Sequence, residues 1–186
     1  TMPERYRRDL QAKWNEWLRS RYESSETLKQ GWGVIDQPLG PNLLLNGDFS
    51  GTGAGWTGGC GASGLQWTIE CHQAARAAAT VSNDFRGGPA LLLEVQTPSS
   101  ANWHVQFNQA RLSVEAGKTY TFRFWARAAS ATPFYAGLQR AHTDWASLAP
   151  SISVTLGTEW RQYSITFQNT VTESNARINF SGFGDR

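Results

Sequence analysis

The chain has 186 residues, enough for one globular domain with a short extension. Hydrophobic residues make up 40% and charged residues only 17%, which excludes a disordered polyelectrolyte. The 17 basic and 15 acidic residues leave a formal charge of +2, so there is no electrostatic reason to expect a nucleic acid or an acidic membrane as partner.

Residues 1–37 are predicted to form a helical segment. Apolar residues recur at spacings of three and four, the pattern of one face of an amphipathic helix, at Leu10, Trp14, Trp17, Leu18 and Tyr22. Ser24 or Ser25 offers an N-cap for a second, shorter helix that extends toward Trp32. Neither helix can bury its apolar side alone, so both are expected to need a neighbouring body.

The signals change near residue 40, and residues 41–186 are predicted to form a separate all-β domain. Short runs of alternating apolar and polar residues are separated by Gly, Ser, Asn and Pro clusters. The clearest run places Tyr120, Phe122 and Phe124 on one face of a strand. Because no helices lie between the strands, the pattern predicts an antiparallel β-sandwich that follows a short N-terminal helical extension.

The outward faces of these strands have an unusual composition. They present Gln, Asn, Arg, Trp and Tyr, where a solvated face usually presents Lys, Glu and Thr. Amide and guanidinium groups hydrogen-bond fixed hydroxyls, and flat aromatic rings cover the weakly apolar faces of sugars. This chemistry is typical of a surface that binds neutral sugars. By strand alternation, the surface is expected to include Asn108, Arg123, Trp125 and Gln139.

Catalytic signals are weak, and we expect this chain not to be an enzyme itself. Asn15-Glu16 resembles an acid/base dipeptide of glycosidases, but it lies in a helical run and no second carboxylate is placed as its partner. His72, His104 and His142 lack the spacing of metal ligands. Cys60 and Cys71 are either a disulfide, as is plausible outside the cytosol, or two independent buried thiols.

A series of motifs, in order along the chain, resembles a known family. They are Asn42-Leu-Leu-Leu-Asn-Gly-Asp-Phe49, Trp56, Gly88-Pro-Ala-Leu91, Trp103-His-Val-Gln106, Gly117-Lys-Thr-Tyr120-Thr-Phe122 and Arg177-Ile-Asn-Phe-Ser-Gly182. They resemble carbohydrate-binding modules of families 4, 9 and 22 over residues 41–186. The resemblance implies a jelly-roll sandwich with a ligand across its concave sheet. Its implied contacts are Trp103, Gln106, Tyr135, Trp145, Arg177, Asn179 and Ser181.

The same resemblance implies three further features. Asp48 is the local carboxylate for a structural calcium ion, although no cofactor is expected to be required. The family closes with a further strand, so this sequence is either cut short after Arg186 or replaces that strand. The run Trp17-Leu-Arg-Ser-Arg-Tyr22 resembles part of a barrel glycoside hydrolase, which implies that the module adjoins such an enzyme.

Together these observations predict a non-catalytic, secreted carbohydrate-binding module, extracellular or periplasmic, that targets an attached glycoside hydrolase. Its expected ligand is a neutral plant-type polysaccharide: cellulose or another β-1,4 or mixed-linkage β-glucan, or else xylan or mannan. Neither a nucleic acid nor a membrane is expected as partner, and no apolar stretch approaches the roughly 18 residues of a membrane span. The alternatives are a protein-interaction β-sandwich and a structural accessory domain of a glycoside hydrolase.

Overall fold

The computed structural model describes residues 4–25, 27–28, 39–62 and 64–185, and it divides into two compact units, Thr1–Pro41 and Asn42–Arg186. The first unit contains helix α1, Glu4–Arg21. Its apolar face is exposed, and Trp14 and Trp17 stack with ring centroids 5.0 Å apart. None of the helices in the described residues is long and apolar enough to cross a membrane.

A second helical turn follows α1. The Ser24 hydroxyl accepts a hydrogen bond from the backbone N–H of Thr27 at 3.1 Å, which is the N-cap bond expected from the sequence. Most of the predicted second helix, with Trp32, lies outside the described residues.

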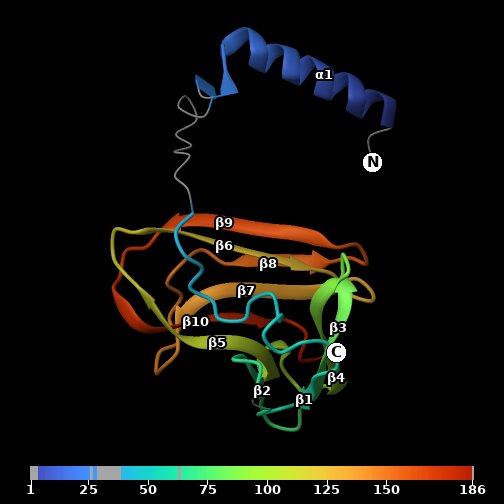
Figure 1. Ribbon diagram of the computed structural model, residues 1–186, viewed down its shortest axis with the longest axis vertical. Coiled ribbons are helices and arrows are strands. Elements are labelled where there is room, and N and C mark those ends of the chain that lie inside the picture. The colour runs from blue at the N-terminus through green and yellow to red at the C-terminus, as the bar shows by residue number, and fades with distance from the viewer. Residues whose placement is uncertain (1–3, 26, 29–38, 63, 186) are drawn as a thin grey trace. The chain divides into compact units, whose positions relative to one another are not determined.

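The second unit is built from three antiparallel sheets (Figure 1). The strands are β1 (Thr57–Gly59), β2 (Thr68–Cys71), β3 (Arg76–Phe85), β4 (Gly88–Thr97), β5 (Val105–Val114), β6 (Thr119–Ala126), β7 (Thr132–Arg140), β8 (Ile152–Leu156), β9 (Arg161–Gln168) and β10 (Glu173–Ser181), and a short 3-10 helix η1 (Asn102–His104) precedes β5. The strand orders are β1-β3-β4, β2-β5-β10-β7-β8 and β6-β9. The predicted all-β antiparallel sandwich with an N-terminal helix is confirmed.

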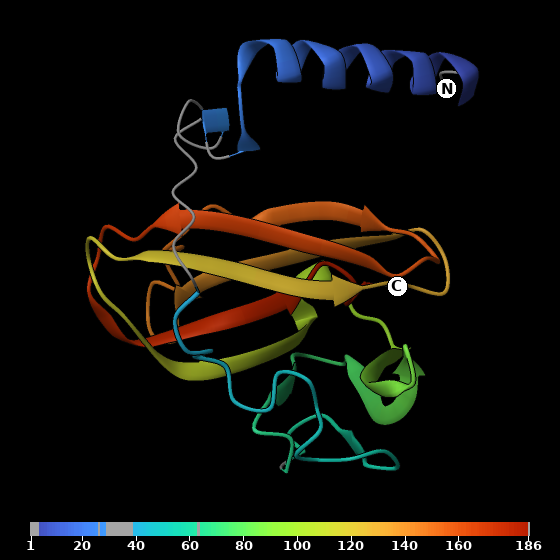
Figure 2. The same ribbon diagram turned by 45° about the horizontal axis from the view of Figure 1, so that its top comes forward.

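Aromatic rings join the β6-β9 pair to the five-stranded sheet. Phe122 and Phe124 of β6 lie 5.9 Å and 5.1 Å from Phe180 of β10, ring centroid to centroid. In Figure 2 the two ribbons of β6 and β9 lie over the layer that contains β5 and β10. Alternation therefore turns one face of β10 toward this core and leaves Arg177, Asn179 and Ser181 on the opposite face.

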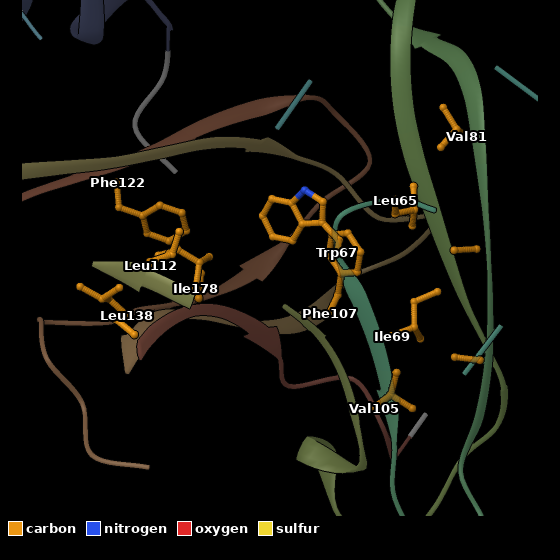
Figure 3. Close-up of a cluster of buried hydrophobic side chains, with 14 of the residues drawn as sticks. Leu65, Trp67, Ile69, Val81, Val105, Phe107, Leu112, Phe122, Leu138 and Ile178 are labelled. Atoms are coloured by element: carbon orange, nitrogen blue, oxygen red, sulfur yellow. The ribbon is translucent and has the colours of Figure 1, made fainter. Parts of the chain in front are cut away.

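Trp67 lies near the centre of the core (Figure 3). Its ring is 5% exposed and stacks on Phe107, with centroids 4.8 Å apart. The indole Nε1 donates a hydrogen bond to the carbonyl of Leu45 at 3.1 Å, so the buried polar atom is satisfied. This bond also ties the segment before β1 to the sandwich.

We predict that Trp67→Ala lowers the free energy of unfolding by roughly 3–5 kcal/mol, because it leaves a cavity and removes the contact with Phe107. Urea unfolding followed by circular dichroism measures the change. As the matched control, Trp103→Ala removes a ring that is 50% exposed and should cost under about 1 kcal/mol. Equal costs for the two variants would contradict the placement of Trp67 in the core.

Candidate functional site

A groove of about 1010 Å³ lies on the face of the five-stranded sheet that points away from the core. Every strand of this sheet contributes to its lining. The contributions are Glu70 from β2, Gln106 from β5, Arg177, Asn179 and Ser181 from β10, Tyr135 and Gln139 from β7, and Ser153 and Thr155 from β8. The groove therefore crosses the whole width of the sheet.

Arg177 occupies the middle of the groove floor, on the central strand β10. The residue is 6% exposed, so its guanidinium needs partners. Its Nη1 donates to Glu70 Oε2 at 3.0 Å, and its Nη2 donates to Gln106 Oε1 at 3.0 Å. When the amide oxygen of Gln139 faces the guanidinium, it accepts from Nε at 3.2 Å and from Nη2 at 3.0 Å. The cation is thus compensated by a carboxylate and two amides.

The network extends along β2 and β5. Asn108 Nδ2 also donates to Glu70 Oε2, at 3.1 Å. The amide nitrogen of Gln106 lies 3.4 Å from His72 Nε2. Glu70 keeps a third of its side-chain surface exposed, at 33%, while Arg177 keeps 7%. A ligand in the groove therefore meets the carboxylate more readily than the guanidinium.

Two tryptophans line the groove. Trp145 comes from the loop after β7, and Trp103 comes from η1. Their exposed fractions are 51% and 50%. The Trp145 ring lies over the Arg177 guanidinium, with 4.5 Å from Cζ to the ring centroid. Trp103 contacts His72 and His104, with centroid distances of 5.3 Å and 4.3 Å. Each ring is thus supported by other side chains and keeps surface free for a flat, weakly apolar ligand.

Tyr135 extends along the sheet over Gly137, the next residue on the same face of β7. A Cβ at position 137 would stand 2.6 Å from the Tyr135 hydroxyl oxygen, so the ring needs a glycine here. On the neighbouring strand, Asn179 is 4% exposed and its Oδ1 has no hydrogen-bond partner. An orphaned amide oxygen in a groove lining is an unused acceptor.

A disulfide positions the strand that carries Glu70. Cys60 and Cys71 are bonded, with their Cα atoms 5.6 Å apart. Cys71 is the last residue of β2, directly before His72, and β2 is an edge strand that pairs only with β5. The bond therefore fastens the free side of β2 to the segment after β1.

The structure brings most of the expected contact residues together. Those that line the groove are Trp103, Gln106, Tyr135, Gln139, Trp145, Arg177, Asn179 and Ser181. Asn108 lies beneath the lining, 3% exposed, and supports Glu70. Arg123 and Trp125 are on β6, in a different sheet, and are not brought to the groove. Trp125 instead contacts Phe85, at 5.4 Å between ring centroids, so the expectation of one shared face is wrong for these two residues.

Sequence reasoning missed Glu70 and His72. They lie on and just after β2, which has only four residues and therefore shows no alternation long enough to read. The available signal was their position around Cys71, because a disulfide fixes the residues beside it. Ser153 and Thr155 of β8 were missed for the same reason, since β8 has five residues.

Asp48, the carboxylate of the calcium expectation, is hydrogen-bonded to a neighbouring residue. Its Oδ1 accepts hydrogen bonds from the Ser50 hydroxyl at 2.8 Å and the Ser50 N–H at 3.1 Å, and these bonds lower the pKa of the Asp48 carboxyl. In the parts of the chain that the structure describes, no three acidic, His or Cys side chains gather to hold a metal. Calcium takes six to eight oxygen ligands, which include backbone carbonyls and waters, so a calcium ion at Asp48 stays a prediction.

Known proteins that resemble this chain include carbohydrate-binding domains. A family model described as a carbohydrate-binding domain matches residues 41–183. A search of curated proteins found no match. Among solved structures, a family 4 carbohydrate-binding module is similar, with 19% identity, a TM-score of 0.53, and coverage of 75% of this chain and 88% of that one.

Two further structures share the fold. A protein described as sugar-binding, from Bacteroides thetaiotaomicron, has 12% identity and a TM-score of 0.50, with 77% of this chain and 94% of that chain covered. The enzymatically active domain of tailspike protein 4 from bacteriophage CBA120 has 18% identity and a TM-score of 0.51, with 77% and 19% covered. At these identities the likeness concerns the fold alone.

We predict that Glu70→Ala lowers the free energy of unfolding by about 1–3 kcal/mol, because it leaves the buried Arg177 guanidinium without its counter-charge. The partial exposure of Glu70 keeps the cost below that of a fully buried pair. In an Arg177→Met background the same change should cost under about 0.5 kcal/mol. Urea unfolding of the four proteins measures this coupling, and an equal cost in both backgrounds would show that the pair is not coupled.

Proposed function

The chain belongs to the carbohydrate-binding domain family that matches residues 41–183, and we propose that its groove binds a neutral plant-type polysaccharide. The preferred ligand class is a β-1,4-linked or mixed-linkage glucan, with xylan or mannan as near relatives. The observation that carries the proposal is the combination of two half-exposed tryptophans with a floor of amide side chains in one groove.

The charge of the groove supports an uncharged ligand. Among the described residues that line it, the charged side chains are Glu70 and Arg177, together with the titratable His72. The first two compensate each other at 3.0 Å. A surface built for an anionic polymer carries an excess of cations instead. Amide groups and a paired carboxylate are suited to hydroxyl groups, which both donate and accept hydrogen bonds.

The width of the groove supports a chain of several sugars. Five strands line it, and four gaps of about 4.8 Å make a floor roughly 19 Å across. Each aromatic ring that covers about 100 Å² of sugar contributes about 2.5 kcal/mol. Two or three such contacts, less the cost of association, correspond to an affinity between about micromolar and millimolar.

The setting of the module is also a proposal. The Cys60–Cys71 disulfide supports a location outside the reducing cytosol, extracellular or periplasmic. The resemblance of Trp17–Tyr22 to part of a barrel glycoside hydrolase supports an adjoining enzyme of that kind, for which the module supplies substrate targeting. The family is generally non-catalytic, and targeting requires only that the module hold the polymer near an active site.

We predict that affinity electrophoresis retards the wild-type protein in gels with soluble β-glucan, xylan or mannan. Trp145→Ala and Tyr135→Ala should each weaken binding by roughly 1–3 kcal/mol without unfolding the protein, because each removes a ring from the groove. Trp14→Ala removes a ring of similar exposure from α1, at 46%, and should leave binding unchanged. Full affinity in both groove variants would place the binding site elsewhere, and no retardation on any glycan would favour the protein-interaction alternative.

We also predict that the chain releases no reducing ends from β-glucan, xylan or mannan. Among the described residues that line the groove the one carboxylate is Glu70, which is bonded to Arg177, whereas glycosidases use two carboxyl groups across the scissile bond. A colorimetric reducing-end assay over several hours measures turnover. Activity that copurifies with the wild-type protein and disappears in Glu70→Gln would contradict this prediction.

A further inference from the structure

The loop that presents Trp145 has an unfavourable backbone. Asp144 has a φ of 82° and Trp145 a φ of 46°, so two consecutive residues with side chains adopt the left-handed region. Such conformations cost free energy and persist only where the surroundings impose them. The contacts that impose this one are therefore part of how the groove is built.

The first set of contacts lies inside the loop. The Asp144 carboxylate accepts from the Ala146 N–H at 3.1 Å and from Arg140 Nη1 at 2.6 Å. The backbone N–H of Trp145 donates to the His142 carbonyl at 2.9 Å, and the N–H of Arg140 donates to the Ala146 carbonyl at 2.9 Å. Asp144 is therefore held from both sides.

A second set fastens the loop to β10. Glu173 Oε2 is 3.0 Å from His142 Nε2 and 3.3 Å from Arg140 Nε, the latter an ion-pair distance without hydrogen-bond alignment. Glu173 Oε1 accepts from the Asn175 N–H at 2.9 Å. The Glu173 side chain is only 12% exposed, so its position is well defined. The loop is thus tied to the same strand that carries Arg177.

We propose that Arg140, Asp144 and Glu173 form a clamp that positions the Trp145 ring over the Arg177 guanidinium and thereby controls saccharide affinity without touching the ligand. None of these three residues is in the described lining of the groove, whereas Trp145 is. The inference rests on the proposed function, and it identifies the clamp residues as positioning residues for that same site. Their substitution acts on binding only through Trp145.

The protonation states of the clamp carboxyls agree with this role. The Ala146 N–H holds the pKa of Asp144 below its ordinary value of 3.8. The Asn175 N–H, together with His142, holds the pKa of Glu173 below its ordinary value of 4.5. Lowered pKa values mean that the clamp is complete above these ordinary values and is lost as the pH falls through the lowered ones.

The groups that pair with the two carboxylates are Arg140 and His142. The clamp should therefore persist at neutral pH and open only as the pH falls below the ordinary pKa values of these two carboxyls.

The first test needs no ligand. The chain has nine tryptophans, so a ¹⁵N–¹H spectrum shows up to nine indole N–H signals, and Trp145→Ala identifies one of them. We expect Asp144→Ala to shift or broaden the Trp145 signal, and Asp144→Asn, which keeps an acceptor for the Ala146 N–H, to shift it less. The wild-type signal should move only as the pH falls below the ordinary pKa values of Asp144 and Glu173.

The control is Asp84→Ala, which removes an equally short ion pair, Arg127–Asp84 at 2.6 Å. Arg127 lies over Trp160, so this variant should disturb the Trp160 signal and leave the Trp145 signal in place. An unmoved Trp145 signal in Asp144→Ala overturns the clamp.

The second test is binding. With the glycan that retards the wild-type protein most strongly, Asp144→Ala and Glu173→Gln should each weaken affinity roughly five- to tenfold at pH 7. In a Trp145→Ala background, Asp144→Ala and Glu173→Gln should not weaken the affinity further. The control Asp84→Ala should leave the affinity unchanged in both the wild-type protein and the Trp145→Ala variant. If Asp144→Ala and Glu173→Gln lower the affinity as much in the Trp145→Ala background as in the wild-type protein, the clamp does not act through Trp145. A wild-type protein that binds no glycan overturns the proposed function, while the indole spectra still decide whether the clamp holds the ring.

Discussion

The buried guanidinium of Arg177 is the constraint on which the groove depends. A cation that is 6% exposed must find acceptors on every side, and here it finds them on both neighbouring strands and on the edge strand β2. Glu70, Gln106 and Gln139 are consequently oriented by hydrogen bonds to one guanidinium. Their remaining hydrogen-bonding atoms are presented to a ligand as a fixed pattern, which limits the entropy that binding must remove.

The same strand that carries Arg177 also anchors the hydrophobic core. Ile178 and Phe180 point into the sandwich while Asn179 and Ser181 point into the groove, because side chains alternate along a strand. The rings of Phe122 and Phe124 pack on Phe180 from the opposite layer. Packing in the core therefore holds β10 in place, and the rigidity of the groove floor is inherited from that packing.

Much of this arrangement could be predicted from alternation and motif order. Those signals identified the sandwich, the helix and the outward positions of Gln106, Gln139 and Asn179. Alternation shows which residues share a face of one strand, but it does not show which sheet the strand joins, and Arg123 and Trp125 were misplaced for that reason. Glu70 was not predicted because β2, with four residues, is too short to show the alternation of a strand. The clamp around Trp145 arises in a loop whose φ angles depend on tertiary contacts.

The sheet that carries the groove ends in two short strands, β2 with four residues and β8 with five. An exposed strand edge offers unpaired backbone groups to the edge of another molecule, and a short edge offers few of them. Modules that crowd along one polymer reach high local concentrations, where edge-to-edge pairing would cause self-association. On the polymer ligand proposed above, the short edges of β2 and β8, with β2 covalently fastened at Cys71, would limit pairing between neighbouring copies through this sheet.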